Sequence, residues 1–199
     1  MQKRLLIVSI VLVFAIQSAQ AVCPVPLQNK QNDAARKLAV SKLSEQMKCD
    51  PKDINNDKSP CNTFASRGLQ SLYGVNDFVN GGGALSANAI AENVAKNPDW
   101  VNVGNVFNED NNFCAQALAN SAYPVIAVIS EPGHGHIALV IPGDPKKSPS
   151  WGFNVANGAS FRLGEPGKAF VGDLISGAFS VEHAKTAQFY YRKASVPGG

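Results

Sequence analysis

The sequence has few of the residues and spacings that hold metals or nucleotides. Its 199 residues include four cysteines and three histidines, without a CxxC or HxxxH pair among them. Metal sites usually show such spacings, so we expect no bound metal. The glycine run at residues 81–83 lacks the GxGxxG and Walker spacings of phosphate-binding loops. We therefore expect no cofactor.

The chain also has only a small excess of positive over negative charge. The chain has 18 Lys and Arg residues against 15 Asp and Glu residues, a net charge of +3. No cluster of basic residues is interleaved with aromatic ones, as nucleic-acid-binding surfaces require. We therefore expect no nucleic acid among the partners.

Long apolar runs are absent except at the start of the chain. Lys3 and Arg4 precede an apolar run at residues 5–16, and Ala19 and Ala21 give the small-x-small pattern of a cleavage site. The run is shorter than the roughly 20 residues of a spanning helix. We interpret residues 1–21 as a signal peptide and expect export to the periplasm or beyond, without membrane attachment after cleavage.

Hydrophobic periodicity divides the remaining chain into a helical first part and a strand-rich second part. We interpret residues 22–50 as an N-terminal arm followed by a helix. Caps at Asp33, Ser86 and either Asn111 or Asn112 favour helices beginning near them. The pattern predicts helices at 34–48, 60–73, 87–96 and 113–120 and strands at 100–106, 125–129, 136–141, 150–157 and 187–192. This order indicates one α+β domain over residues 22–199, with an antiparallel sheet.

Cys61 stands in the first turn of the helix predicted at residues 60–73. Pro60 suits the first helical position, and Gly74 suits the residue after the last. The positive end of the helix dipole stabilises a thiolate there, which makes Cys61 a candidate nucleophile. The alternative is a half-cystine or a buried thiol.

The four cysteines, Cys23, Cys49, Cys61 and Cys114, can pair in three ways. An exported protein usually pairs its cysteines, but a nucleophilic Cys61 must stay free, which leaves at most one bridge among the other three. We favour Cys23–Cys49, because this bridge would tie down the N-terminal arm.

A cysteine nucleophile needs a base beside it, and histidine suits that task. His136 begins a predicted buried strand, whose end can present an imidazole. His134 lies in the loop before it, and we interpret His183 as a surface residue. Without a catalytic partner, His136 would be a structural residue.

Two motifs resemble the NlpC/P60 and CHAP branch of the papain-like cysteine peptidases. Cys61-Asn62-Thr63-Phe64 matches the CNxF start of the nucleophile helix, and Gly135-His136-Ile137-Ala138-Leu139-Val140 matches a GHxAxV strand. Residues 117–143 are also similar to a subset of bacterial cell-wall amidases that carry ALANxxYPVIA before GHGHIALVxPG. The order of the motifs, with the cysteine helix first, agrees as well.

The resemblance implies a papain-like fold in which the nucleophile helix packs on an antiparallel sheet. It implies a secreted enzyme, a cysteine peptidase or amidase, that hydrolyses amide bonds in peptidoglycan peptides. Cys61 would attack the carbonyl, His136 would transfer the proton, and the Cys61 backbone N–H would bind the oxyanion. The partner implied is a peptidoglycan peptide. We further expect a monomer, and a cognate inhibitor protein is a candidate partner.

The family also uses a polar residue on the next strand to orient the histidine. We favour Asn154, with Asn157 as the alternative; Ser150 or a water molecule could also take this place. Trp151 and His134 are further candidates for substrate binding, although Trp151 is equally suited to the core.

Two alternative hypotheses about the function remain. An exported non-catalytic protein that binds the cell wall, or an immunity or inhibitor protein, could keep the fold and tolerate Cys61 in a disulfide. A papain-like acyltransferase would use the same residues.

Overall fold

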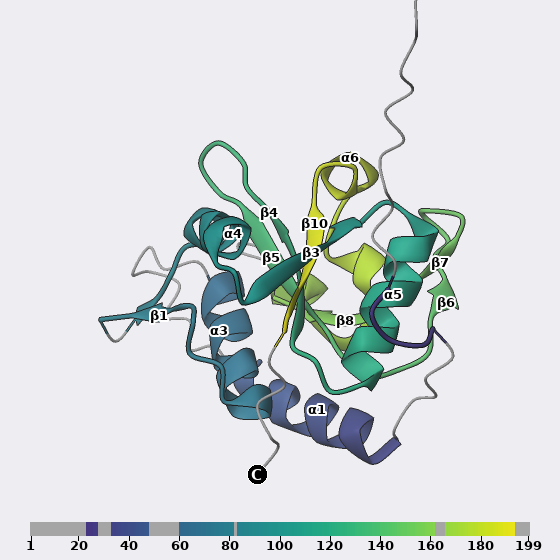
Figure 1. Cartoon of the computed structure of the whole chain (residues 1–199), viewed down its shortest axis with the longest axis horizontal. Coiled ribbons are helices and arrows are strands. Elements are labelled where there is room, and N and C mark those ends of the chain that lie inside the picture. Colours follow the sequence, from purple (N-terminus) through teal and green to yellow (C-terminus); the bar gives the residue numbers. More distant parts are fainter. Residues whose placement is uncertain (1–22, 28–32, 48–59, 82, 162–165, 194–199) are drawn as a thin grey trace, which may run out of the picture.

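The computed structural model describes residues 23–27, 33–47, 60–81, 83–161 and 166–193. The expected signal peptide and Cys49 lie outside these residues. In the described part of the chain, one central sheet is covered by helices on both faces (Figure 1). No helix in these ranges has the length and apolar character needed to cross a membrane.

The central sheet is antiparallel throughout, with the strand order β3-β10-β4-β5-β8-β9. Its strands are β3 (Trp100–Asn105), β4 (Val125–Ile129), β5 (His136–Val140), β8 (Asn157–Ser160), β9 (Phe170–Leu174) and β10 (Gln188–Arg192). Two short pairs flank it, formed by β1 (Val79–Asn80), β2 (Gly83–Ala84), β6 (Lys146–Lys147) and β7 (Asn154–Val155). The predicted α+β class with an antiparallel sheet is confirmed.

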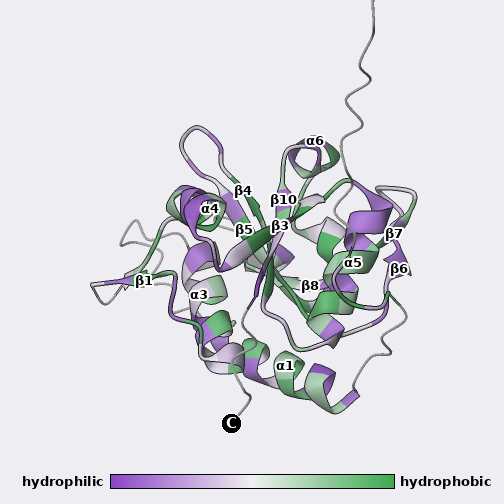
Figure 2. Cartoon of the chain, in the orientation of Figure 1, coloured by the Kyte–Doolittle hydropathy of each residue, from purple (hydrophilic) through white to green (hydrophobic). Residues whose placement is uncertain are grey.

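Helices α1 (Asp33–Gln46), α3 (Pro60–Tyr73) and α4 (Ala87–Lys96) pack on one face, here named the α3 face. Helices α5 (Glu109–Asn120) and α6 (Val181–Ala184) pack on the other, the α5 face. Successive side chains of a strand alternate between the faces. The α3 face carries Ile126, Val128, Ile137 and Leu139, and the α5 face carries Ala127, Ile129, Ala138 and Val140. Figure 2 shows this hydrophobic centre, with hydrophilic residues on the outer turns.

Local signals place α3 and α4 where the sequence predicts them. The Ser86 side chain caps α4 by accepting a hydrogen bond from the Ala89 N–H at 3.2 Å. Ile90 and Val94 of α4 are buried, as are Phe64 and Leu69 of α3. The apolar stripes of both helices therefore point into the core.

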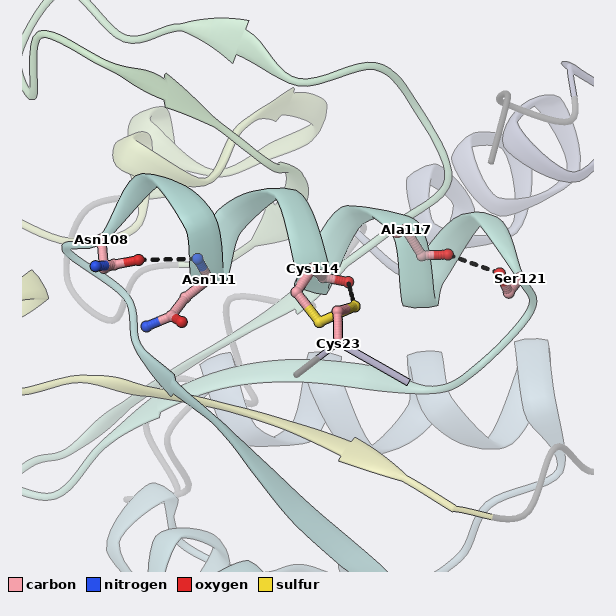
Figure 3. The surroundings of a disulfide bond; sticks show 6 residues. All are labelled: Cys23, Asn108, Asn111, Cys114, Ala117 and Ser121. Atoms are coloured by element: carbon pink, nitrogen blue, oxygen red, sulfur yellow. Dashed lines mark hydrogen bonds between the residues drawn. A yellow bond between two sulfur atoms is a disulfide. The ribbon is translucent and has the colours of Figure 1, made fainter. Parts of the chain in front are cut away.

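Three predictions of local structure are wrong. Helix α5 begins at Glu109 and is capped by Asn108, whose side chain accepts from the Asn111 N–H at 2.9 Å (Figure 3). Asn112 is therefore inside the helix, where its side chain is fully buried. Residues 150–153 form a turn instead of a strand. The apolar spacing of residues 34–48 predicts that Leu38 of α1 faces the core, but Leu38 is 54% exposed, and Ala39 and Leu43 make the buried stripe.

Three amide side chains of α5, those of Asn112, Gln116 and Asn120, lie four residues apart and point to one side of the helix. We name them the amide ladder. Gln116 is 1% exposed. Its Oε1 accepts from the Asn157 N–H at 2.7 Å, and its Nε2 donates to the Ile141 carbonyl at 2.9 Å. The side chain thus satisfies two backbone groups that are cut off from water.

The other two side chains of the amide ladder, Asn112 and Asn120, also bond to backbone groups. Asn112 Oδ1 accepts from the Ala156 N–H at 3.1 Å. Asn120 Oδ1 accepts from the Gly143 N–H at 2.9 Å, and its Nδ2 donates to the Gly143 carbonyl at 3.0 Å. Helix α5 therefore acts as a hydrogen-bonding partner for the chain that leaves β5 and returns as β8.

The bridge in the structure joins Cys23 to Cys114, so the predicted Cys23–Cys49 pairing is wrong (Figure 3). Cys114 lies in the middle of α5, and the two Cα atoms are 5.5 Å apart. Val25, two residues after Cys23, is partly buried and packs against the core cluster on the α5 face. Tertiary packing therefore determines the path of the arm and, with it, the pairing.

We expect Cys114→Ala to lower the free energy of unfolding by about 2–4 kcal/mol, because the bridge closes a loop of 91 residues that otherwise adds entropy to the unfolded chain. Urea denaturation of the oxidised protein measures the change. Adding reductant to the wild type should reproduce it, and equal stability of oxidised and reduced protein would contradict it.

We expect Gln116→Leu to cost about 2–4 kcal/mol, because two buried backbone groups lose their partners. Gln70→Leu is the matched control, since it makes the same change at an exposed position of α3. Urea denaturation compares the two variants. A similar small effect of both would show that the amide ladder contributes little.

Candidate active site

The N-terminus of α3 lies at the end of the sheet where β5 begins. Leu139 is paired with Ala159, and the same register, extended by two residues, places Phe161 beside Ile137. The ring centroids of Phe64 and Phe161 are 6.5 Å apart. One turn further along α3, Gly68 packs against Leu139, which lies further along β5. Helix α3 thus runs from the His136 end of β5 toward its other end.

Cys61 is the second residue of α3, as the sequence predicts. Its side chain lies outside the described residues. The next residue, Asn62, is 3% exposed, and its Nδ2 donates to the Leu85 carbonyl just before α4. The beginnings of α3 and α4 are therefore joined beside this end of the sheet.

Asn88 of α4 holds the turn that connects β4 to β5. Its Nδ2 donates to the Glu131 carbonyl at 2.8 Å, and its Oδ1 accepts from the Glu131 N–H at 3.1 Å. The same amide leaves no room for a side chain at Gly135, where a Cβ would lie 2.3 Å from Asn88 Oδ1. The Glu131 carboxylate also contacts His183 Nε2 at 3.3 Å. The turn is thus fixed from both layers of helices.

His136 is the first residue of β5 and is paired with Ile129, so its side chain points to the α5 face. Its Nε2 lies 2.9 Å from Ser160 Oγ. Its ring meets the Phe179 ring edge-on, with the centroids 5.2 Å apart. Ser160 is fully buried and Phe179 is 3% exposed. The imidazole therefore has defined neighbours on β8 and after the 3₁₀ helix η2 (Ile175–Gly177).

The structure brings the first turn of α3 and His136 to the same end of the sheet, from opposite faces. The α3 helix packs through Phe64 and Leu69 on the α3 face, whereas the imidazole turns to the α5 face. Direct proton transfer between Cys61 and His136 would require the thiol to approach the imidazole past the first residues of β5.

Neither asparagine predicted to orient the histidine is brought to it. The Asn154 side chain donates to Glu109 Oε1 at 2.9 Å. The Asn157 side-chain Nδ2 donates to Gln116 Oε1 at 3.3 Å, and the Asn157 backbone carbonyl accepts from the Ile141 N–H. Ile141 lies beyond the other end of β5 from His136. Both asparagines therefore belong to the network around α5.

Ser160 is the contact that the sequence did not predict. An alternating strand pattern places residues on faces, but it does not reveal which residue of β8 lies beside His136. That pairing depends on the excursion through β6 and β7, which delays the start of β8 to Asn157. The Ser150 side chain, the other alternative considered, contacts Ser148 at 3.1 Å.

The two candidates for substrate binding have different surroundings. Trp151 is 6% exposed and packs against the rings of Phe107 and Phe153, with centroid distances of 5.6 and 5.9 Å. It therefore offers little surface to a ligand. His134 is exposed on the β4–β5 turn, two residues before His136.

An open hollow of about 610 Å³ lies between α4 and the start of the β4–β5 turn. Its lining is mostly small or polar: Ser86, Asn88, Ala89, Ala91, Glu92 and Ser130. Lys96 lowers the pKa of the Glu92 carboxyl through a hydrogen bond and its charge. Because Asn88 also packs against Gly135, the hollow adjoins the residue before His136. Its size lies within the range of ligand-binding sites.

Among the residues that the structure describes, no three His, Cys, Asp or Glu side chains gather as a metal site would require. No protein-family model matches the chain, and no curated protein is detectably similar to it.

We expect Asn88→Ala to increase hydrogen exchange of the Glu131 amide at least tenfold, because the turn loses both hydrogen bonds to α4, each contributing about 1 kcal/mol. Exchange measured by NMR or mass spectrometry tests this. Asn102→Ala, an exposed position of β3, is the control. Unchanged exchange at residues 130–135 would show that the turn is held by other contacts.

Proposed function

We propose that the chain is an exported cysteine hydrolase of the papain-like, NlpC/P60 or CHAP type that cleaves amide bonds in peptidoglycan peptides. The observation that supports this best is the meeting of two elements at one end of the sheet. Helix α3 begins there with Cys61 in its first turn, and β5 begins there with His136. A cysteine at a helix N-terminus and a histidine at a strand end are the two parts of a thiol-imidazole pair.

The proposed reaction has two steps. The Cys61 thiolate attacks the carbonyl carbon, and the Cys61 backbone N–H helps to stabilise the oxyanion. The imidazolium of His136 gives its proton to the leaving amine, and a thioester remains. His136 then takes a proton from water, the hydroxide oxygen attacks the thioester, and the acid product and the thiol are released.

The hollow beside α4 is the proposed substrate groove. Ser86, Asn88 and Ser130 line it with small polar side chains, and Glu92 adds a carboxylate. A peptide is polar along its backbone, so it fits this lining better than an apolar ligand would. His134 is exposed on the same β4–β5 turn and is the proposed contact for the part of the peptide nearest His136.

One observation favours a second candidate. The imidazole of His136 turns toward Phe179, on the face opposite to the one on which α3 packs. An exported non-catalytic protein, which binds cell-wall fragments or acts as an immunity or inhibitor protein, would use the same hollow without needing a thiol-imidazole pair.

We expect purified protein beginning at Val22 to cleave peptidoglycan fragments, and Cys61→Ala and His136→Ala to reduce the rate at least about a thousandfold, as losses of a nucleophile or its base do. Cys49→Ala is the matched control and should retain the rate. Product masses identify the bond that is cut.

Iodoacetamide labelling without reductant gives a second readout. Ready alkylation of Cys61 agrees with the proposal. A disulfide at Cys61, or equal cleavage by wild type and Cys61→Ala, would overturn it. Fragments that bind at the hollow and remain intact with both proteins would support the non-catalytic candidate.

A further inference from the structure

We propose that Ser160 is the positioning residue for His136: its hydroxyl accepts a hydrogen bond from the imidazole Nε2–H, so that Nδ1 is the nitrogen that exchanges protons with the nucleophile. The role of this contact in catalysis rests on the proposed function, whereas the contact itself is independent of that function.

The position of Ser160 follows from the pairing of β5 with β8. Leu139 is paired with Ala159, which places Ser160 opposite Ala138, two residues along the strand from His136. Residues two apart on a strand share a face, so the side chains of Ser160 and His136 both point to the α5 face. Their polar atoms, Oγ and Nε2, are 2.9 Å apart.

Burial keeps water from competing for the Ser160 hydroxyl. Ser160 is fully buried. Water therefore has little access to the hydroxyl, and a hydrogen bond in such surroundings is stronger than the same bond in solvent. The burial also argues against Ser160 as a nucleophile, because no substrate carbonyl can reach its oxygen.

Phe179 limits the remaining freedom of the ring. It is 3% exposed, and its ring meets the imidazole at an interplanar angle of 73°. The hydrogen bond fixes one nitrogen of the imidazole, and the aromatic contact restricts rotation of its plane. Together they define which edge of His136 is turned away from β8.

The chemistry of a hydroxyl differs from that of the asparagine predicted for this place. An asparagine side chain accepts through its oxygen and donates through its nitrogen, whereas a hydroxyl donates and accepts through one atom. When the hydroxyl accepts, Nε2 carries the proton and Nδ1 is basic. After Nδ1 takes a proton, Nε2–H still donates to the same oxygen. The acceptor arrangement therefore persists in both protonation states of the proposed cycle, without adding a negative charge beside the imidazolium.

The test compares Ser160→Ala with Ser160→Thr, which keeps the hydroxyl. Ser148→Ala is the matched control, because Ser148 is also fully buried but bonds to Ser176. Nitrogen-15 NMR of the His136 ring reports the protonated nitrogen, and steady-state kinetics on peptidoglycan fragments reports kcat and KM. Should Ser160→Ala not fold, Ser160→Cys replaces it, because a thiol fills similar space and accepts weakly.

In the wild type we expect the proton on Nε2, with slow exchange. Ser160→Ala should lose this protected proton and lower kcat about tenfold, as the loss of one hydrogen bond does, without changing KM. Ser160→Thr should restore both readouts, and Ser148→Ala should change neither.

Two results would overturn the proposal: an unchanged Nε2 proton in Ser160→Ala, or a loss of kcat that Ser148→Ala reproduces. If the wild type cleaves no fragment, the proposed function fails, and the NMR comparison still decides whether Ser160 holds His136.

Discussion

The amide ladder on α5 is the constraint on which the arrangement around β5 depends. The chain leaves β5, makes an excursion through β6 and β7, and returns as β8. In a sheet, a neighbouring strand would satisfy the backbone of such an excursion; here side chains of a helix do so, with Gln116 bonded to both Ile141 and Asn157. Because these bonds fix where β8 starts, they also determine that Ser160, and neither asparagine, stands beside His136.

Local patterns were sufficient for much of the fold. Ser86 and Asn97 cap the two ends of α4 through backbone chemistry that acts within a few residues, and the apolar runs of β4 and β5 are equally local. The amide ladder was not predictable in this way. Polar residues at four-residue spacing usually indicate the exposed side of a helix, and the sequence does not reveal that strand backbone covers them. The same holds for Cys23, whose partner depends on where a distant helix lies.

The candidate site combines predictable and unpredictable parts. Pro60 and Gly74 predict a helix that begins with Cys61, and the glycine before His136 predicts a strand end. The face to which His136 points could not be predicted, because both faces of this sheet are covered by helices and both carry apolar residues. The register between β4 and β5 decides it by placing His136 opposite Ile129.

The bridge between Cys23 and Cys114 makes the stability of the protein depend on the redox conditions around it. It joins Cys23, near the start of the described chain, to a helix 91 positions further along, so it cannot form before Cys114 has been synthesised. The cytoplasm keeps thiols reduced. A reduced chain would therefore lack this covalent cross-link, and would unfold and be degraded more readily than the oxidised chain. Redox state and resistance to degradation are thus linked through a single bond.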